Sequence, residues 1–140
     1  MRSVLDFYRE LQKKYDGSIN FKKVCADEGI IAVKGVLPDG LNGLFVGNGK
    51  YKVIILNEKI SREERRDWAF HELWHALKSP PAAESHASLK EEYKANLFAA
   101  LCRAPFVRDG DTIESLRERY NVSAWIAKAR LDHEVKKMFR

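Results

Sequence analysis

The stretch Trp68–Ser79, WAFHELWHALKS, carries two histidines four residues apart inside an otherwise apolar segment. Its apolar residues recur at the i, i+3, i+4, i+7 spacing of one helix face, which predicts a helix packed against a core. The preceding residues 61–64, SREE, have the pattern of a capping box and predict where this helix begins. The sequence therefore predicts a buried helix that nevertheless carries His71, Glu72 and His75 at its centre.

These three residues have the spacing of a metal centre. An α-helix turns by about 100° per residue, so His71 and His75 project from one face and both imidazoles can reach one ion. Two such nitrogens fill half of the tetrahedral shell of Zn²⁺. Glu72 lies about 100° further round, where its carboxylate can take a proton from a bound water. The pattern predicts a zinc peptidase with Glu72 as the catalytic base, and the alternative is two ordinary histidines at the edge of a core helix.

A catalytic zinc site also needs a third protein ligand and an open position for water. The next histidine, His86, lies between proline- and serine-rich stretches that are typical of a loop. The segment 91–105, EEYKANLFAALCRAP, offers the adjacent carboxylates Glu91 and Glu92. Glu92 shares a helix face with Asn96, which favours Glu92 as the third ligand and leaves Glu91 as the alternative. Asn96 could then orient a ligand histidine or the ligand carboxylate through a hydrogen bond.

Together, AFHELWHAL, a proline- and serine-rich spacer and EYKANLFAA followed by a proline resemble the ImmA/IrrE family of zinc metallopeptidases. The resemblance covers roughly residues 30–131 and includes the strand before the motif and the segment LRERYNVSAWIAKARL. The sequence departs from the family pattern at Trp74, where the family usually has glycine, and at LCRAP, which replaces Leu-Leu-Met-Pro.

The resemblance implies that His71, His75 and Glu92 bind Zn²⁺ and that Glu72 is the catalytic base. It also implies a bacterial or phage protease whose protein substrate is a helix-turn-helix repressor of a phage, a mobile element or a stress response. Two other functions remain open: a DNA-binding regulator with a structural zinc, and an inactive relative that binds a repressor without cleaving it.

The segments before this motif predict the remainder of the fold. Helical spacing and turn residues predict two short helices before the chain reaches three apolar segments, IIAVKGV (30–36), LNGLFVG (41–47) and YKVIILN (51–57). Pro-Asp-Gly and Gly-Asn-Gly turn signals join these segments and predict an antiparallel meander. The expected fold is therefore α+β, with a small three-stranded antiparallel sheet packed against helices.

The C-terminal segment 111–132, DTIESLRERYNVSAWIAKARLD, predicts a helical hairpin. We expect one domain, with a catalytic core at about residues 1–107 and a helical appendage at about 108–140. The favoured role of the hairpin is to pack on the catalytic core or to present the substrate. A DNA-reading helix-turn-helix is the alternative, because the segment contains four basic residues: Arg117, Arg119, Lys128 and Arg130.

Composition sets wider bounds on the function. The 140 residues carry a net charge of +5, which permits an acidic partner but makes direct nucleic-acid binding improbable on charge alone. No run of about 18 apolar residues occurs, so no membrane partner is expected. The charged N-terminal segment does not have the pattern of a signal peptide, and the two cysteines are far apart, which predicts a cytoplasmic protein with free thiols.

Overall fold

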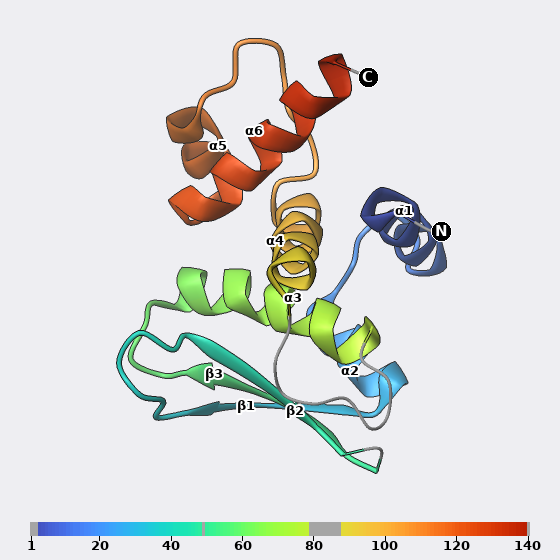
Figure 1. The fold of residues 1–140 in the computed structure, drawn as a ribbon, viewed down its shortest axis with the longest axis vertical. Coiled ribbons are helices and arrows are strands. Elements are labelled where there is room, and N and C mark those ends of the chain that lie inside the picture. The colour runs from blue at the N-terminus through green and yellow to red at the C-terminus, as the bar shows by residue number, and fades with distance from the viewer. Residues whose placement is uncertain (1–2, 49, 79–87, 140) are drawn as a thin grey trace.

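A computed structural model describes residues 3–48, 50–78 and 88–139 of the chain. The described residues form α1 (Val4–Lys14), α2 (Phe21–Glu28), β1 (Ile30–Gly35), β2 (Gly43–Gly47), β3 (Lys52–Asn57), α3 (Arg62–Lys78), α4 (Leu89–Arg103), α5 (Ile113–Tyr120) and α6 (Ala124–Met138) (Figure 1). The expected α+β class is confirmed. None of the helices in these ranges has both the length and the hydropathy that a membrane span requires.

The predicted antiparallel meander is wrong, because the three strands form a mixed sheet in the order β1-β3-β2. Strand β2 pairs antiparallel with β3, whereas β1 pairs parallel with β3 along its other side. The connection 36–42 passes around the end of β3, where the Glu58 N–H donates to Gly35 O and the Asn57 N–H donates to Asn42 O, both at 2.9 Å. This connection is long enough to cross one intervening strand, so the most apolar strand takes the central position.

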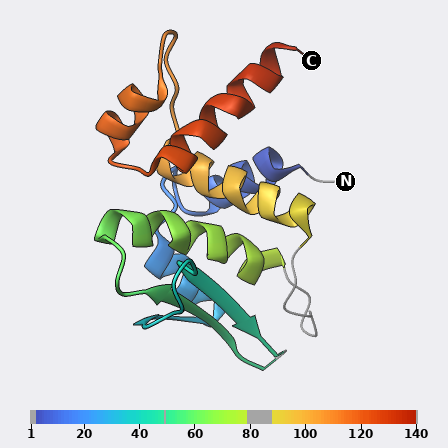
Figure 2. The ribbon, with the colours of Figure 1, turned by 60° about the vertical axis from the view of Figure 1, so that its left-hand side comes forward.

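The helices are stacked on one face of this sheet. Figure 2 shows the sheet, α3, α4 and α6 in that order from bottom to top. Strand β3 contributes the buried side chains of Ile54 and Leu56 to the core against α3. On the other side of α3, the rings of Trp74 and Phe98 pack with centroids 5.5 Å apart, and Phe7 of α1 packs against both. The core therefore encloses the middle of α3, where the motif histidines lie.

The predicted C-terminal hairpin is present as α5 and α6. The turn between them passes through Asn121, whose φ of 53° is the left-handed conformation that asparagine tolerates. Arg130 is buried, and its guanidinium donates to Ala104 O at 2.8 Å and to Pro105 O at 3.0 Å. Arg130, one of the four candidate DNA contacts, is therefore committed to the end of α4.

A second candidate DNA contact is also engaged inside the protein. Arg119 makes two contacts with the Asp111 carboxylate, at 2.6 and 2.9 Å. This pair ties α5 to the loop that precedes it. The other two also have partners within the protein, since Arg117 Nε donates to Val122 O at 3.3 Å and Lys128 Nζ lies 2.7 Å from Asp132 Oδ2 in an exposed pair.

Candidate metal centre

The predicted metal ligands lie together between α3 and α4. His71 and His75 lie one turn apart on α3, and Glu92 lies in the first turn of α4. His71 Nε2 is 3.0 Å from Glu92 Oε2, and His75 Nε2 is 2.9 Å from Glu92 Oε1. The three ligand atoms lie within 4.8 Å of one another. Ligand atoms about 2 Å from a tetrahedral zinc are about 3.3 Å apart, so these side chains already converge to nearly the required separation.

A hydrogen bond orients His71 for this role. The imidazole is 2% exposed, and its Nδ1 lies 2.8 Å from Asn96 Oδ1. When the amide oxygen of Asn96 accepts, Nδ1 carries the proton and the Nε2 lone pair points toward Glu92. A metal ligand histidine typically has its second nitrogen held in this way. The sequence left open whether Asn96 holds an imidazole or the carboxylate, and the structure has it against the imidazole.

The second histidine supplies a direct test of whether these residues fit a metal ion. His75 Nε2 is buried and has no hydrogen-bond partner among the residues that the structure describes. The nearby Glu92 oxygen is close enough for an ion pair, but the contact does not have hydrogen-bond geometry. A buried nitrogen with an unused lone pair is costly unless a ligand engages it. The cluster therefore has the donor set and the convergence that could bind a metal ion.

Glu91 and His86 were the other candidates for the third ligand. The Glu91 carboxylate is instead paired with Lys94, whose Nζ lies 3.4 Å away on the same helix. Glu91 therefore does not join the cluster. His86 lies outside the described residues.

Glu72 occupies a buried position beside the cluster. Its carboxylate lies 3.8 Å from His71 Nε2, and the residue is only 6% exposed. Burial, followed by the negative charge of Glu92, raises the pKa of Glu72 to about 7, while a hydrogen bond from the Phe45 backbone opposes this rise. A carboxyl group with such a pKa can both accept and release a proton near neutral pH.

The edge strand β2 brings backbone groups to Glu72. Because the Asn57 N–H donates to Asn42 O, the alternation of an antiparallel ladder directs the polar groups of Gly43 and Phe45 to the free edge. The Phe45 N–H on this edge is the donor to the Glu72 carboxylate. A Cβ added to Gly43 would lie 3.0 Å from Glu72 Cγ, so a larger residue here would displace the Glu72 side chain.

A buried carboxylate one turn before the first histidine joins this centre to the C-terminal hairpin. Asp67 is fully buried, and it accepts from Arg103 Nε and from the Ser123 N–H, each at 2.8 Å. Arg103 stands in the segment LCRAP, which departs from the family pattern. Sequence reasoning missed this pairing. An acidic residue among buried apolar residues, with an arginine at the end of the following helix, was the available signal.

The anchored hairpin places an aromatic wall beside the histidines. The Trp125 ring of α6 lies 6.1 Å from the His71 ring and 4.8 Å from the Trp68 ring, measured between centroids. Trp68 in turn lies 4.9 Å from His71. From the sequence, a pocket-lining role is possible for Trp68, but a core position is favoured, because aromatic residues at helical spacing usually belong to the core.

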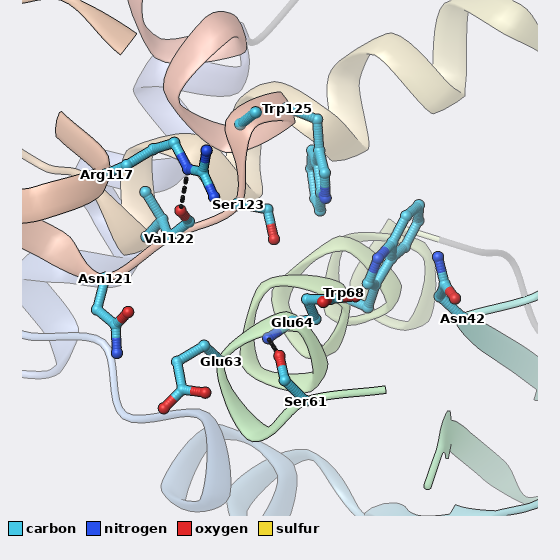
Figure 3. A pocket seen from close by; sticks show the side chains of 11 residues that line it. Asn42, Ser61, Glu63, Glu64, Trp68, Arg117, Asn121, Val122, Ser123 and Trp125 are labelled. Atoms are coloured by element: carbon cyan, nitrogen blue, oxygen red, sulfur yellow. Dashed lines mark hydrogen bonds between the residues drawn. The ribbon is translucent and has the colours of Figure 1, made fainter. Parts of the chain in front are cut away.

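The two tryptophans also line a cavity of about 440 Å³ between the first half of α3 and the turn that joins α5 to α6 (Figure 3). The chain matches no protein-family model, and no curated protein matches it. The two imidazoles, the two carboxylates and the surfaces around them are therefore the features that indicate a function.

Proposed function

We propose that the protein is a zinc-dependent metallopeptidase of the ImmA/IrrE type that hydrolyses a peptide bond in a protein substrate. The observation that carries this proposal is the convergence of His71, His75 and Glu92, with the buried Glu72 carboxylate beside them. The resemblance supports a helix-turn-helix repressor as the substrate class.

The donor set is one that suits zinc. Two imidazole nitrogens and one carboxylate oxygen are a common three-residue ligand set of catalytic zinc sites, which keep a further position open. Asn96 orients the His71 ring so that its Nε2 is the binding atom. A bound Zn²⁺ would polarise the scissile carbonyl and lower the pKa of a water molecule.

Glu72 is the proposed catalytic residue. Its carboxylate would accept a proton from the attacking water and later deliver that proton to the leaving amine. Burial raises the pKa of Glu72, and a bound Zn²⁺ would oppose that rise, which favours the ionised form that accepts the proton of the water. The Phe45 N–H fixes the orientation of the carboxylate.

The free edge of β2 is the proposed platform for the substrate backbone. Apart from the Phe45 N–H, which already donates to Glu72, its outward-directed N–H and C=O groups could pair with an extended peptide, as in other cases of β-strand addition. Gly43 and Phe45 lie on this edge next to Glu72, so a peptide bound there would pass the catalytic carboxylate.

Substitution of Glu72 by glutamine tests the proposal. Zinc-loaded wild type and Glu72→Gln are incubated with a panel of helix-turn-helix repressors, including any encoded beside the gene, and fragments are identified by mass spectrometry. We expect fragments with the wild type only, together with equal zinc content in both proteins. Cleavage by Glu72→Gln at an unchanged rate would exclude Glu72 as the base. Repressor binding by the wild type without fragments would instead indicate an inactive relative.

A matched pair of variants tests the ligand set. Glu92→Ala removes a carboxylate from the cluster, whereas Glu91→Ala removes the neighbouring carboxylate, which pairs with Lys94. We expect Glu92→Ala to lose zinc on dialysis and Glu91→Ala to retain it. Equal zinc content in the two variants would remove Glu92 from the ligand set.

The DNA-binding alternative has weaker support from the geometry. The first turn of α6, which would enter a DNA groove in a helix-turn-helix, is held against α3 by the Ser123–Asp67 hydrogen bond. Trp125 of the same turn packs on Trp68. Salt-sensitive DNA binding that persists in Glu72→Gln would favour this alternative over proteolysis.

A further inference from the structure

The cavity lies beside the candidate metal centre, and two tryptophan rings separate the cavity from His71. Trp68 and Trp125 line the cavity, and their rings lie 4.8 Å apart at an interplanar angle of 41°. The same two rings lie 4.9 and 6.1 Å from the His71 ring. Figure 3 shows both indoles along one side of the cavity. Only the rings of Trp68 and Trp125 therefore lie between the cavity and His71 on this side.

The edge strand leads from Glu72 to this cavity. Asn42, which lines the cavity, directly precedes Gly43, where strand β2 meets Glu72. A peptide in strand conformation advances about 3.3 Å per residue. A side chain that enters the cavity from a peptide on this edge would therefore belong to a residue within about two positions of the bond at Glu72.

The charges around the cavity favour a cation. Glu63 and Glu64 line it from the first turn of α3, and neither carboxylate has an ion pair or side-chain hydrogen bond within the described ranges. Arg117 lines the opposite side, where its Nε donates to Val122 O at 3.3 Å (Figure 3). Two carboxylates against one guanidinium leave a net negative lining.

A helix start commonly carries acidic residues, because they interact favourably with the helix dipole. That preference explains the two glutamates by themselves. It does not explain why they share a cavity with two indole faces beside a catalytic carboxylate. Aromatic faces and carboxylates together are the surroundings that a guanidinium or ammonium group binds.

We propose that this cavity binds a basic side chain of the substrate at a residue close to the scissile bond, with arginine preferred over lysine. The inference rests on the proposed peptidase function. A planar guanidinium can stack on Trp68 or Trp125 while it pairs with Glu63 or Glu64, which a compact ammonium group does less well. A neutral apolar side chain would desolvate the carboxylates without pairing them.

Pairs of peptide mixtures test this specificity. The two members of a pair differ at one position, which holds either arginine or citrulline. Internally quenched ten-residue peptides are random except for one position, fixed as arginine or as its uncharged isostere citrulline. For zinc-loaded wild type we expect one position at which arginine exceeds citrulline by about tenfold in kcat/KM. The double variant Glu63→Gln/Glu64→Gln should reduce that ratio to near one. The double variant Glu114→Gln/Glu118→Gln, which removes the same number of charges on the exposed side of α5, should leave the ratio intact.

A binding measurement separates failure of this inference from failure of the proposed function. For every fixed position in turn, the arginine and citrulline mixtures are titrated into zinc-loaded Glu72→Gln and followed by quenching of tryptophan fluorescence, so the measurement does not depend on cleavage. Tighter binding of the arginine peptide, without cleavage by wild type, would support the cavity and refute hydrolysis. Cleavage without any preference for arginine would overturn the cavity inference and leave hydrolysis standing. Equal affinity of Glu72→Gln for the two peptides would also overturn it. Circular dichroism checks that the double variant keeps its helices.

Discussion

Removal of the Asp67 carboxylate is expected to be a strong perturbation outside the candidate metal ligands. In Asp67→Ala, the Arg103 guanidinium loses its partner at 2.8 Å while the arginine side chain stays 9% exposed. Its other hydrogen bond is a long one of 3.5 Å, to Asn121 O. The Ser123 N–H at the start of α6 loses its acceptor as well, and the Ser123 side chain makes no capping hydrogen bond that could replace it.

The expected loss follows from these two contacts. Removal of one partner of a buried ion pair typically costs about 3–5 kcal/mol, because the other charge is left buried and unpaired. Loss of a helix cap typically costs about 0.5–2 kcal/mol. We therefore expect Asp67→Ala to lower the free energy of unfolding by about 3.5–7 kcal/mol, a large part of the roughly 5–15 kcal/mol that stabilises an ordinary domain.

Urea unfolding followed by tryptophan fluorescence measures this effect, at one fixed zinc concentration because ligands shift apparent stability. A double variant, Asp67→Ala/Arg103→Met, removes both charges and should recover at least 2 kcal/mol relative to Asp67→Ala, roughly the cost of the uncompensated guanidinium. A loss below about 1 kcal/mol in the single variant, or strict additivity in the double variant, would refute the reasoning.

Three further predictions concern the site and its supports. Asn96→Leu should weaken zinc binding about 10- to 100-fold in chelator competition, because the imidazole that it orients loses its acceptor; unchanged affinity would contradict that role. Gly43→Ala should lower kcat at least tenfold with zinc content unchanged, roughly the effect of a misplaced catalytic group, since the added Cβ presses on Glu72; full activity would contradict the close approach. The pKa of Asp111 lies well below its usual range because Arg119 donates to it, so its contribution to stability is complete above about pH 4 and is lost on acidification below that. Thermal melts of Asp111→Asn and wild type should therefore differ most at pH 7, and the difference should shrink progressively as the pH falls below about 4. A difference that stays constant over that acid range would exclude the ion pair.

Local patterns predicted the helices of the site, because the position and the faces of a helix depend on residues that are close together in the sequence. The spacing of His71 and His75 fixes both on one face of any helix, whatever the tertiary fold. Glu92 was separated from Glu91 by its shared face with Asn96, and the structure brings Glu92, not Glu91, to the histidines.

The sheet order and the buried pair could not be predicted in the same way. A turn signal reports that the chain reverses, but it does not report whether the next strand pairs with the last one or lies one strand further away. The Asp67–Arg103 pair joins residues 36 positions apart on two helices, so it depends on how α3 and α4 cross. Glycine at residue 43 was read as part of a strand, and its contact with Glu72 appeared only when strand and helix were placed together.

The hydrogen bond from α6 to Asp67 has a consequence for any shortened form of the protein. A truncation after Tyr120 would remove the backbone donor of Ser123 and the ring of Trp125, and it would strip one partner from a carboxylate in the same helix as the histidines. Helix α6 and helix α3, which carries His71 and His75, therefore form one cooperative unit and are expected to unfold together.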